Sequence, residues 1–169
     1  VAQSNRRGDL LAQREQLARQ QGASVHADAA AVARGRELLI VAVVDAAQTE
    51  AVLFGEGGAV HALTPGTTVM LCPTLAPQTV EDCARRLAGR AIGCIDAPMS
   101  GGPLRARDGS MSLMVACADA EFQRWLPLLS TLSSRLFRIG TRPGDGARTK
   151  LVNNLLAAIN LAGAAEALA

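Results

Sequence analysis

Blocks of apolar and polar residues alternate along the chain and predict strands and helices in turn. The continuous apolar run 38–44 is typical of a strand that is buried on both faces of a sheet. Apolar stripes at helical spacing after Pro77 and after Asp119 predict helices that each pack one side against a sheet. Further strands are predicted at 67–72, 91–95, 111–117 and 135–139, and Val1–Ser4 looks like the end of another. This alternation predicts an α/β fold with a mostly parallel sheet and helices on both faces.

Polar residues at the ends of these blocks predict the helix boundaries. Asp9, Asp28 and Asp119 each precede an apolar stripe and are expected to cap a helix. Gly22 is expected to end the first of these helices. A turn after Asp45 leads to a helix around 49–54, and the segment 103–108 is expected to be a loop.

The last part of the chain, from Lys150 to Ala169, predicts one helix that is apolar on nearly every side. Such a pattern indicates a buried helix. Lys150 and Asn154 are four residues apart and share one face of it. An unpaired polar group in such surroundings costs about 2–7 kcal/mol, so these residues either satisfy the structure or line a cleft.

Composition excludes several classes of protein. Charged residues make up 19% of the chain, the formal net charge is +2, and aromatic residues amount to 2%. This balance argues against nucleic-acid binding, which needs a basic face with stacking side chains. We expect no membrane span and no signal peptide, and therefore a cytoplasmic protein. The four cysteines lack C-x-x-C spacing and lie in apolar runs, which favours buried, reduced thiols over a disulfide or zinc framework.

Ligands of open α/β sheets bind at the carboxyl ends of the strands, where several polar or glycine-rich segments are predicted here. The segment Ser100-Gly101-Gly102 offers a hydroxyl and backbone N–H groups that can approach an anion such as a carboxylate. An ordinary glycine loop is the alternative. Serine nucleophile chemistry is disfavoured because the segment is not G-x-S-x-G, and His26 and His61 are expected at the surface. The other segments at strand ends are Val43-Val44-Asp45, Pro73-Thr74 and Asn5-Arg6-Arg7.

Lys150 is the strongest candidate for acid–base chemistry. A solvated lysine at a helix start is the default alternative. However, the positive end of a helix dipole disfavours a cation, so a position in the first turn would lower the pKa of Lys150. A lowered pKa suits a general acid or base near neutral pH. Asn154 can hydrogen-bond a substrate hydroxyl or hold the lysine, whereas Asn153 and Asn160 are interpreted as structural.

Two long motifs carry a resemblance to a known family. The chain resembles the β-hydroxyacid dehydrogenases, which include 3-hydroxyisobutyrate dehydrogenase, 2-hydroxy-3-oxopropionate reductase and threonate dehydrogenase. Its two motifs look like their substrate-binding and catalytic signatures, and the resemblance covers essentially the whole chain. The motifs are Asp96-Ala97-Pro98-Met99-Ser100-Gly101-Gly102, followed by 109–115, and Gly144-x-Gly146-x-x-x-Lys150-x-x-Asn153-Asn154.

The resemblance implies a role for each candidate residue. Lys150 would be the general acid/base, and Asn154 would position the reacting hydroxyl. Ser100, Gly101 and Gly102 would hold the carboxylate of a small substrate. Val43-Val44 falls where the family usually has Leu-Pro beside the cofactor. Thr74 falls on its nicotinamide-side threonine, but Cys72-Pro73 replaces a more usual polar pair before it. These two departures concern the shape of the cofactor pocket.

The resemblance also implies a nicotinamide cofactor, NAD or NADP. By that placement, Asn5, Arg6 and Arg7 lie where the second Rossmann strand ends. An acidic residue there would favour NAD by binding the ribose 2′-hydroxyl. Arginine can instead pair with a 2′-phosphate through two hydrogen bonds. The interpretation therefore favours NADP, with simple surface arginines as the alternative.

The family comparison predicts a domain division. Residues 1–144 would form a Rossmann-like NAD(P)-binding domain that lacks the family's first strand and G-x-G-x-x-G loop. Residues 145–169 would begin the long interdomain helix of an all-helical C-terminal domain that is absent here. That domain would build a homodimer or homotetramer. On its own, the segment is expected to bind dinucleotides weakly or not at all and to expose an apolar helix that is prone to aggregate.

The sequence thus predicts an oxidoreductase that transfers a hydride between NAD(P) and a small β-hydroxy acid or its semialdehyde. The alternative is a dinucleotide-fold binding module that has lost its chemistry. Intact Lys150, Asn154 and the Ser-Gly-Gly segment favour the enzyme, because a dead module has no reason to keep a charge in an apolar helix. An imine-reducing relative is disfavoured because it uses another residue in place of Lys150.

Overall fold

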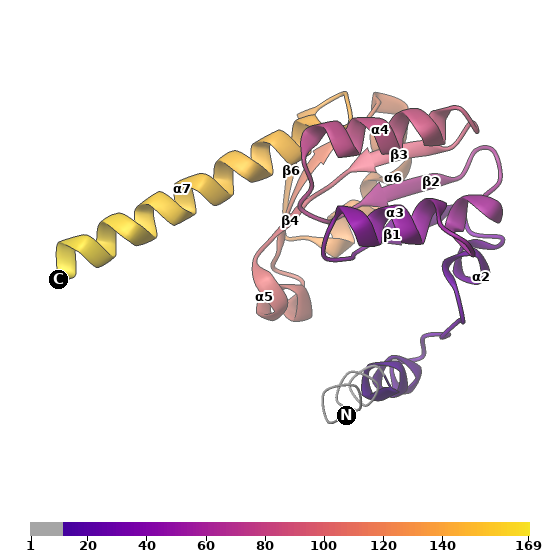
Figure 1. The fold of residues 1–169 in the computed structure, drawn as a ribbon, viewed down its shortest axis with the longest axis horizontal. Helices are drawn as coiled ribbons and strands as arrows, with labels where there is room; N and C mark the ends of the chain where they lie inside the picture. The colour runs from indigo at the N-terminus through magenta and orange to yellow at the C-terminus, as the bar shows by residue number, and fades with distance from the viewer. Residues whose placement is uncertain (1–11) are drawn as a thin grey trace.

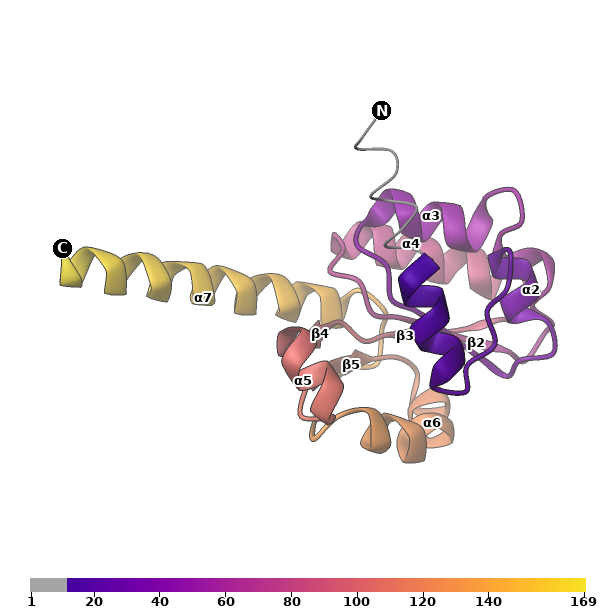
Figure 2. The ribbon, with the colours of Figure 1, turned by 90° about the horizontal axis from the view of Figure 1, so that it is seen from below.

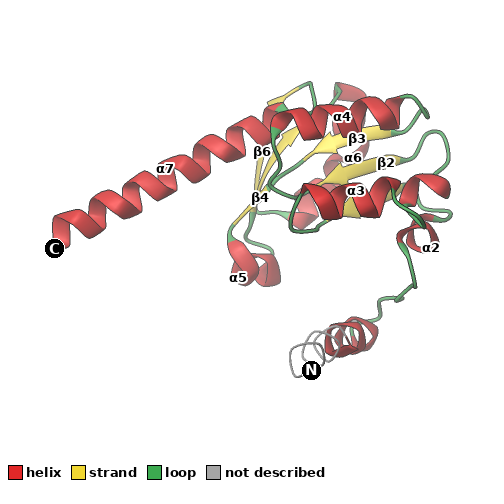
Figure 3. Cartoon of the chain, viewed as in Figure 1, coloured by secondary structure: helices red, strands yellow, loops and turns green. Residues whose placement is uncertain are grey.

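A mixed six-stranded sheet forms the centre of the computed structural model, which describes residues 12–169 (Figures 1 and 3). The strand order is β1-β2-β3-β5-β4, and β6 pairs with the free side of β5. The pairs β1/β2, β2/β3 and β5/β6 are parallel, whereas β3/β5 and β4/β5 are antiparallel. The strands are β1 (Leu38–Val41), β2 (Thr68–Leu71), β3 (Gly93–Asp96), β4 (Met99–Ser100), β5 (Ser112–Ala116) and β6 (Arg135–Gly140).

Helices follow the strands on both sides of the sheet, as the sequence predicted. Beyond a helix over residues 12–20, they are α2 (Ala29–Ala33), α3 (Ala46–Phe54), α4 (Pro77–Ala88), α5 (Gly102–Asp108), α6 (Asp119–Leu132) and α7 (Asp145–Leu168), with a 3-10 turn at Ala59–His61. The Asp28 and Asp45 carboxylates accept the N–H groups of Ala31 and Gln48, which caps α2 and α3. The prediction for Asp119 was wrong, because Ala118 is the cap and Asp119 is the first helical residue.

Two hydrophobic clusters cover the two faces of the sheet, and alternate strand residues supply them. On one face, Val69 and Leu71 pack with Val80 and Leu87 of α4. On the other face, Met70 and Ile95 pack with Leu129 of α6. Every residue of β2 is buried. The prediction that the run 38–44 forms a strand buried on both faces was wrong, because β1 lies at an edge of the sheet in the described part of the chain and its Ile40 is exposed.

The segment between β4 and β5 forms a helix, which corrects the expectation of a loop at 103–108. Met99 and Ser100 pair with Leu113 and Ser112, and α5 makes the connection between the two strands. Gly109 follows this helix with φ 73°, a left-handed conformation that suits glycine at a helix end. Figure 1 shows α5 below the sheet, away from the first turns of α7.

Helix α7 corrects the prediction of a buried helix. Only its first turns are buried, at Gly146, Ala147 and Lys150. It then projects away from the sheet (Figures 1 and 2), and side chains such as Leu155 and Ile159 are 59% and 56% exposed. By length and composition α7 meets the criterion for a membrane span, contrary to the expectation that no segment would. One such helix is weak evidence, since core helices of soluble proteins meet the same criterion.

Candidate functional site

The carboxyl ends of the three parallel strands meet at one edge of the sheet. Val41 of β1 is in register with Leu71 of β2, and Leu71 is in register with Asp96 of β3. The segments that follow these strands therefore emerge side by side. This edge is where ligands bind in open α/β sheets.

The predicted cofactor residues of the first two strands lie at this edge. Val44 follows β1 with a side chain that is 78% exposed, and Val43 is half-buried. Thr74 follows β2 and is exposed, next to a buried Cys72 whose N–H donates to Val41. Val44 and Thr74 each lie three residues beyond the last β1/β2 pair, Val41 and Leu71, so both follow the carboxyl ends of their strands. Asn5, Arg6 and Arg7 lie outside the described residues.

The Ser100-Gly101-Gly102 segment turns from β4 into α5, and its backbone requires glycine. Gly101 has φ 138° and Gly102 has φ 68°, in the left-handed region that disfavours other residues. A Cβ on Gly101 would also lie 2.8 Å from the Arg105 side chain. Ser100 is half-buried and lines a cavity of about 320 Å³. The glycines therefore have a structural reason as well as the predicted substrate role. The cavity is lined by Met99, Ser100, Gly102, Pro103, Ala106 and Met111.

Lys150 is buried in the second turn of α7, with 8% of its surface exposed. Burial lowers the pKa of Lys150, because the charged form loses hydration. The predicted direction is confirmed but its predicted cause is wrong. The helix begins at Asp145, and the effect of a helix dipole falls off within the first turn. No ion pair joins Lys150 to a carboxylate within residues 12–169.

Lys150 is also the only lysine in the 169 residues, and every other formal cation is an arginine. The two residue types differ in acid–base chemistry. Burial shifts the pKa of a lysine readily, whereas a guanidinium stays protonated in proteins. The chain thus uses arginine for its ion pairs and places its single titratable amine in a buried position. This contrast adds to the case for proton transfer at Lys150.

The side chains of α7 after Lys150 are less enclosed. Asn153 is half-buried and lines a groove with Met114 and Phe137, whereas Asn154 is exposed. The interpretation of Asn154 as a residue that touches substrate is therefore not tested by packing within this part of the chain.

Strand β5 connects the Ser-Gly-Gly segment to α7. Ser112 is paired with Ser100, and Met114 lies two residues further along the strand, about 7 Å away. The Met114 carbonyl oxygen packs against Gly146 of α7, where an added Cβ would approach it to 2.6 Å. The second motif, which follows α6 and β6 in the sequence, therefore packs on β5, which contains the end of the first motif.

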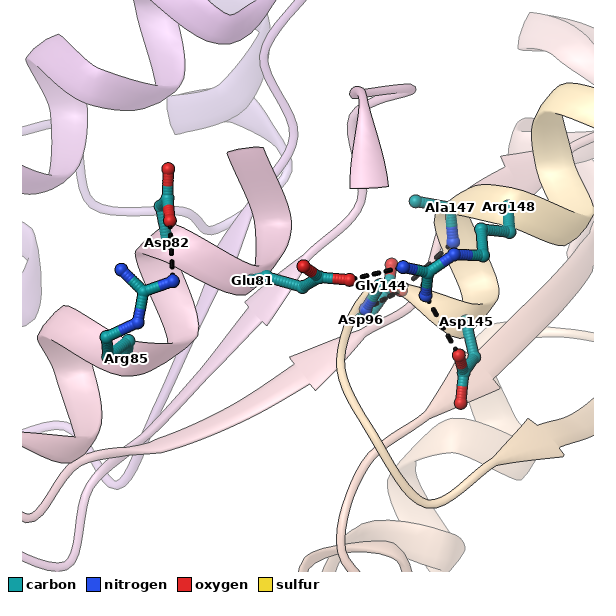
Figure 4. A network of polar contacts seen from close by, with 8 residues as sticks. All are labelled: Glu81, Asp82, Arg85, Asp96, Gly144, Asp145, Ala147 and Arg148. Atoms are coloured by element: carbon teal, nitrogen blue, oxygen red, sulfur yellow. Dashed lines mark hydrogen bonds and ion pairs between the residues drawn. The ribbon is translucent and has the colours of Figure 1, made fainter. Parts of the chain in front are cut away.

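Asp96 is a polar residue at this edge to which sequence reasoning gave no role. It ends β3 with 1% of its surface exposed, and its Oδ2 accepts the N–H groups of Gly144 and Ala147 at 2.8 and 3.0 Å (Figure 4). Burial raises the pKa of Asp96 to about 6. A signal was available, because an aspartate ending an otherwise apolar strand needs buried partners.

Other titratable residues form no second centre in the described part of the chain. Cys72, Cys83, Cys94 and Cys117 are buried free thiols, as predicted. The His61 ring lies 3.2 Å from the Gly55 carbonyl oxygen. Within residues 12–169 no group of His, Cys, Asp or Glu is arranged to hold a metal ion.

Comparisons with known proteins agree with this geometry. A family model described as the NAD binding domain of 6-phosphogluconate dehydrogenase matches residues 6–140. L-threonate dehydrogenase of Escherichia coli K12 is 41% identical over 142 residues, 84% of this chain and 47% of the relative. 2-hydroxy-3-oxopropionate reductase of the same organism is 34% identical over 137 residues, 81% of this chain and 47% of the relative. The chain spans about half the length of the curated relatives it matches.

Solved structures show the same relationship. The crystal structure of a 3-hydroxyisobutyrate dehydrogenase from Salmonella typhimurium has a TM-score of 0.76 and 36% identity, covering 83% of this chain and 49% of that one. The structure of Psf3 in complex with NADP+ and 2-OPP has a TM-score of 0.85 and 28% identity, covering 92% of this chain and 55% of that one.

Proposed function

The chain belongs to the family of the NAD binding domain of 6-phosphogluconate dehydrogenase, and on this basis we propose an NAD(P)-dependent oxidoreductase acting on a small β-hydroxy acid or its semialdehyde. The relatives named L-threonate dehydrogenase and 2-hydroxy-3-oxopropionate reductase support this class of substrate. The observation that carries the proposal is a single buried lysine of lowered pKa on α7, whose first turn packs on β5, the strand paired with Ser100.

Lys150 is the general acid and base in this proposal. During oxidation its neutral amine takes the proton of the substrate hydroxyl, as the C–H bond at the same carbon gives up a hydride. During reduction its ammonium returns a proton to the carbonyl oxygen that gains the hydride at carbon. Burial lowers the pKa of Lys150, which shifts the amine toward the form that can take a proton. Asn154, one turn later, orients the reacting oxygen.

The carboxylate of the substrate binds at Ser100, Gly101 and Gly102. The two glycines have no Cβ that would keep an anion away from their N–H groups, and their left-handed conformations favour glycine. The Ser100 hydroxyl supplies one more donor at the mouth of the cavity. The apolar lining from Met99 and Met111 suits a short carbon chain rather than a second charged group. A panel of C3 and C4 hydroxy acids and semialdehydes, assayed with both cofactors, identifies the substrate.

The residues at the carboxyl edge fit a nicotinamide dinucleotide. The exposed Val44 side chain offers an apolar surface for a flat ring, and the exposed Thr74 hydroxyl offers a polar partner. When bound, the cofactor supplies or accepts the hydride. Val43, Val44 and Thr74 would hold its position at the strand ends, and Asn5, Arg6 and Arg7 would contact the ribose and its phosphate. The NADP+ complex of Psf3 supports this class of cofactor.

The larger organisation follows the same proposal. Residues 1–144 form the nucleotide-binding domain, and residues 145–169 begin a second, helical domain that covers α7. The exposed apolar side chains of α7 support such a covering. A homodimer or homotetramer in the cytoplasm is the expected form of the whole enzyme.

The Lys150→Ala variant of the natural full-length protein tests the proposed chemistry. We expect kcat for hydride transfer to fall by about 10²–10⁴-fold, because the acid/base is lost. Lys150→Arg is the matched control for charge: it keeps a cation that cannot release its proton, so it should be as inactive as the alanine variant. Small primary amines should partly restore the alanine variant. Turnover that survives in Lys150→Ala would rule out this role.

Cofactor preference is the second prediction. If Arg6 and Arg7 bind a 2′-phosphate, kcat/KM with NADP should exceed that with NAD by about tenfold, as expected for one charge-assisted hydrogen-bonded pair. Steady-state kinetics with both cofactors measures this ratio. The double variant Arg6→Ala/Arg7→Ala should reduce it to near one. A clear preference of the unmodified protein for NAD would contradict the assignment.

A further inference from the structure

Asp96 is a carboxylate in a place where carboxylates are costly. It is the last residue of β3, and only 1% of its surface is exposed. Burial raises its pKa to about 6, although the backbone N–H groups of Ala147, Gly144 and Gly146 act in the opposite direction. A buried charge of this kind needs compensation from hydrogen bonds. The compensation comes from one element, the N-terminus of α7.

The contacts of Asp96 fix where α7 begins. Its Oδ2 accepts from Gly144, the cap residue, and from Ala147, the third residue of the helix. These are N–H groups that a helix terminus leaves without intrahelical partners. The negative charge also interacts favourably with the positive end of the helix dipole. Asp96 therefore takes the part of a capping side chain, although it lies about 50 residues earlier in the sequence.

The packing around this contact leaves little freedom. Gly146 lies between the Met114 carbonyl oxygen of β5 and the Asp96 carboxylate, at 2.6 and 3.0 Å from the position of a Cβ. Gly144 has φ 104°, a left-handed conformation that directs its N–H toward Asp96. The start of α7 is thus held against β3 and β5 at once. Lys150 follows Ala147 by three residues, so its ammonium moves with this turn.

We infer that Asp96 is a positioning residue, which fixes the first turn of α7 and thereby the place of the Lys150 ammonium relative to the substrate. This inference rests on the proposed function of Lys150. Asp96 forms no ion pair with Lys150 within residues 12–169, so it acts through the backbone of the helix. The ionised carboxylate of Asp96 binds the N–H groups of Gly144 and Ala147 more strongly than the protonated form, because charge-assisted hydrogen bonds are about twice as strong as neutral ones.

The groups around Asp96 make its ionisation a distinct step. Burial raises the pKa of Asp96, and Asp145 of α7 adds to this shift. Burial, and then the Asp96 charge, raise the pKa values of Cys72 and Cys94. Both thiols stay neutral near pH 7. Glu81 of α4 is occupied by an ion pair with Arg148, which also pairs with Asp145 (Figure 4). Between pH 5 and 7 the carboxyl of Asp96 is therefore the group at this junction that changes charge.

The pH profile of the full-length enzyme in the direction of carbonyl reduction tests the inference. Lys150 remains protonated over the acid range in that direction, so its own titration does not produce an acid limb. As pH falls through about 6, Asp96 gains a proton and kcat should decrease to a lower plateau. The Asp96→Asn variant keeps a neutral acceptor of the same shape. Its kcat should be about tenfold lower at pH 7.5, equal to the acid plateau, and independent of pH between 5 and 7.

Two further variants separate positioning from a general loss of structure. Asp96→Ala, which removes the acceptor, should lower kcat by about a hundredfold, the expected cost of a misplacement near 1 Å, with little change in the KM of the cofactor. Asp145→Asn removes the neighbouring charge and should move the acid limb to lower pH without abolishing it. An Asp96→Asn enzyme with an unchanged acid limb and unchanged kcat would overturn the inference.

Amide hydrogen exchange provides a readout that does not depend on turnover. Corrected for intrinsic rates, protection of the Gly144 and Ala147 amides should fall below pH 6 in the unmodified protein and should be low at every pH in Asp96→Ala. Equal protection in both proteins would also overturn the inference. One outcome separates this inference from the proposed function: Lys150→Ala retains turnover, while the two amides lose protection in Asp96→Ala and below pH 6 in the unmodified protein. In that case the proposed acid/base role fails and the anchoring of α7 by Asp96 stands.

Discussion

Helices α4 and α7 differ in how well their apolar patterns match their burial. Helix α4 has an apolar stripe on a polar background, and the sheet buries that stripe at Val80, Cys83 and Leu87. Helix α7 is apolar on most sides, yet only its first turns are buried. Leu87 is fully buried, whereas Leu155 is 59% exposed. The pattern of α4 is complete within this part of the chain, and the pattern of α7 is not.

The difference shows what a hydrophobic pattern determines. A stripe reports that one side of a helix needs a partner, and a helix that is apolar all round reports that every side needs one. The sheet supplies a partner for one side of the first turns of α7. Large apolar side chains of its later turns, such as Leu155, Ile159 and Leu161, remain exposed together, so a further partner is expected to cover them. The proposed helical domain would be that partner.

The largest expected effect comes from truncating one leucine on each helix. In the 169-residue chain, Leu87→Ala should lower the free energy of unfolding by about 2–5 kcal/mol, because it leaves a cavity in a packed core. Leu155→Ala should change it by less than about 0.5 kcal/mol, as a surface substitution does. Urea unfolding measures both. In the full-length protein, where Leu155 is expected to be covered, Leu155→Ala should lower the free energy of unfolding as much as Leu87→Ala does. If Leu155→Ala has a small effect there too, nothing covers α7.

Smaller effects are expected from replacing two glycines of α7 with alanine, and the two changes in stability should have opposite signs. Gly146→Ala would place a Cβ 2.6 Å from the backbone oxygen of Met114, so we expect a loss of about 1–3 kcal/mol from overpacking. Gly163→Ala meets no atom within 4 Å and should stabilise the helix by about 1 kcal/mol, since alanine is the better helix former. Thermal unfolding of the two variants gives the comparison, and a neutral Gly146→Ala would mean that the first turn is not held tightly.

Much of the architecture was predictable because it depends on local periodicity. The run at 38–44 gave β1, the stripe after Pro77 gave α4, and Asp28 gave a cap. The ends of strands were predicted less accurately. Strand β1 ends at Val41 rather than Val44, because the last residues of the apolar run lie beyond its pairing with β2. Helix α5 was missed because its glycines and proline resemble a loop.

The candidate site was predicted in part. Resemblance to a family identified Ser100, Lys150 and the segments at the strand ends, and the structure places these elements around β5 and one edge of the sheet. Their roles remain proposals. An aspartate that ends an apolar strand signalled that Asp96 needs partners, but the sequence could not identify them, because they are backbone N–H groups of a helix that begins about 50 residues later.

The sequence by itself determined the strand and helix alternation, the buried thiols and the single lysine in an apolar helix, since each depends on residue type and spacing. Only the tertiary structure decided that β5 and β6 run antiparallel to the other strands, that burial rather than a helix terminus lowers the pKa of Lys150, and that Asp96 caps α7. These features depend on which distant segments meet. Burial, and the hydrogen bonds that compensate it, arise only when the chain has folded.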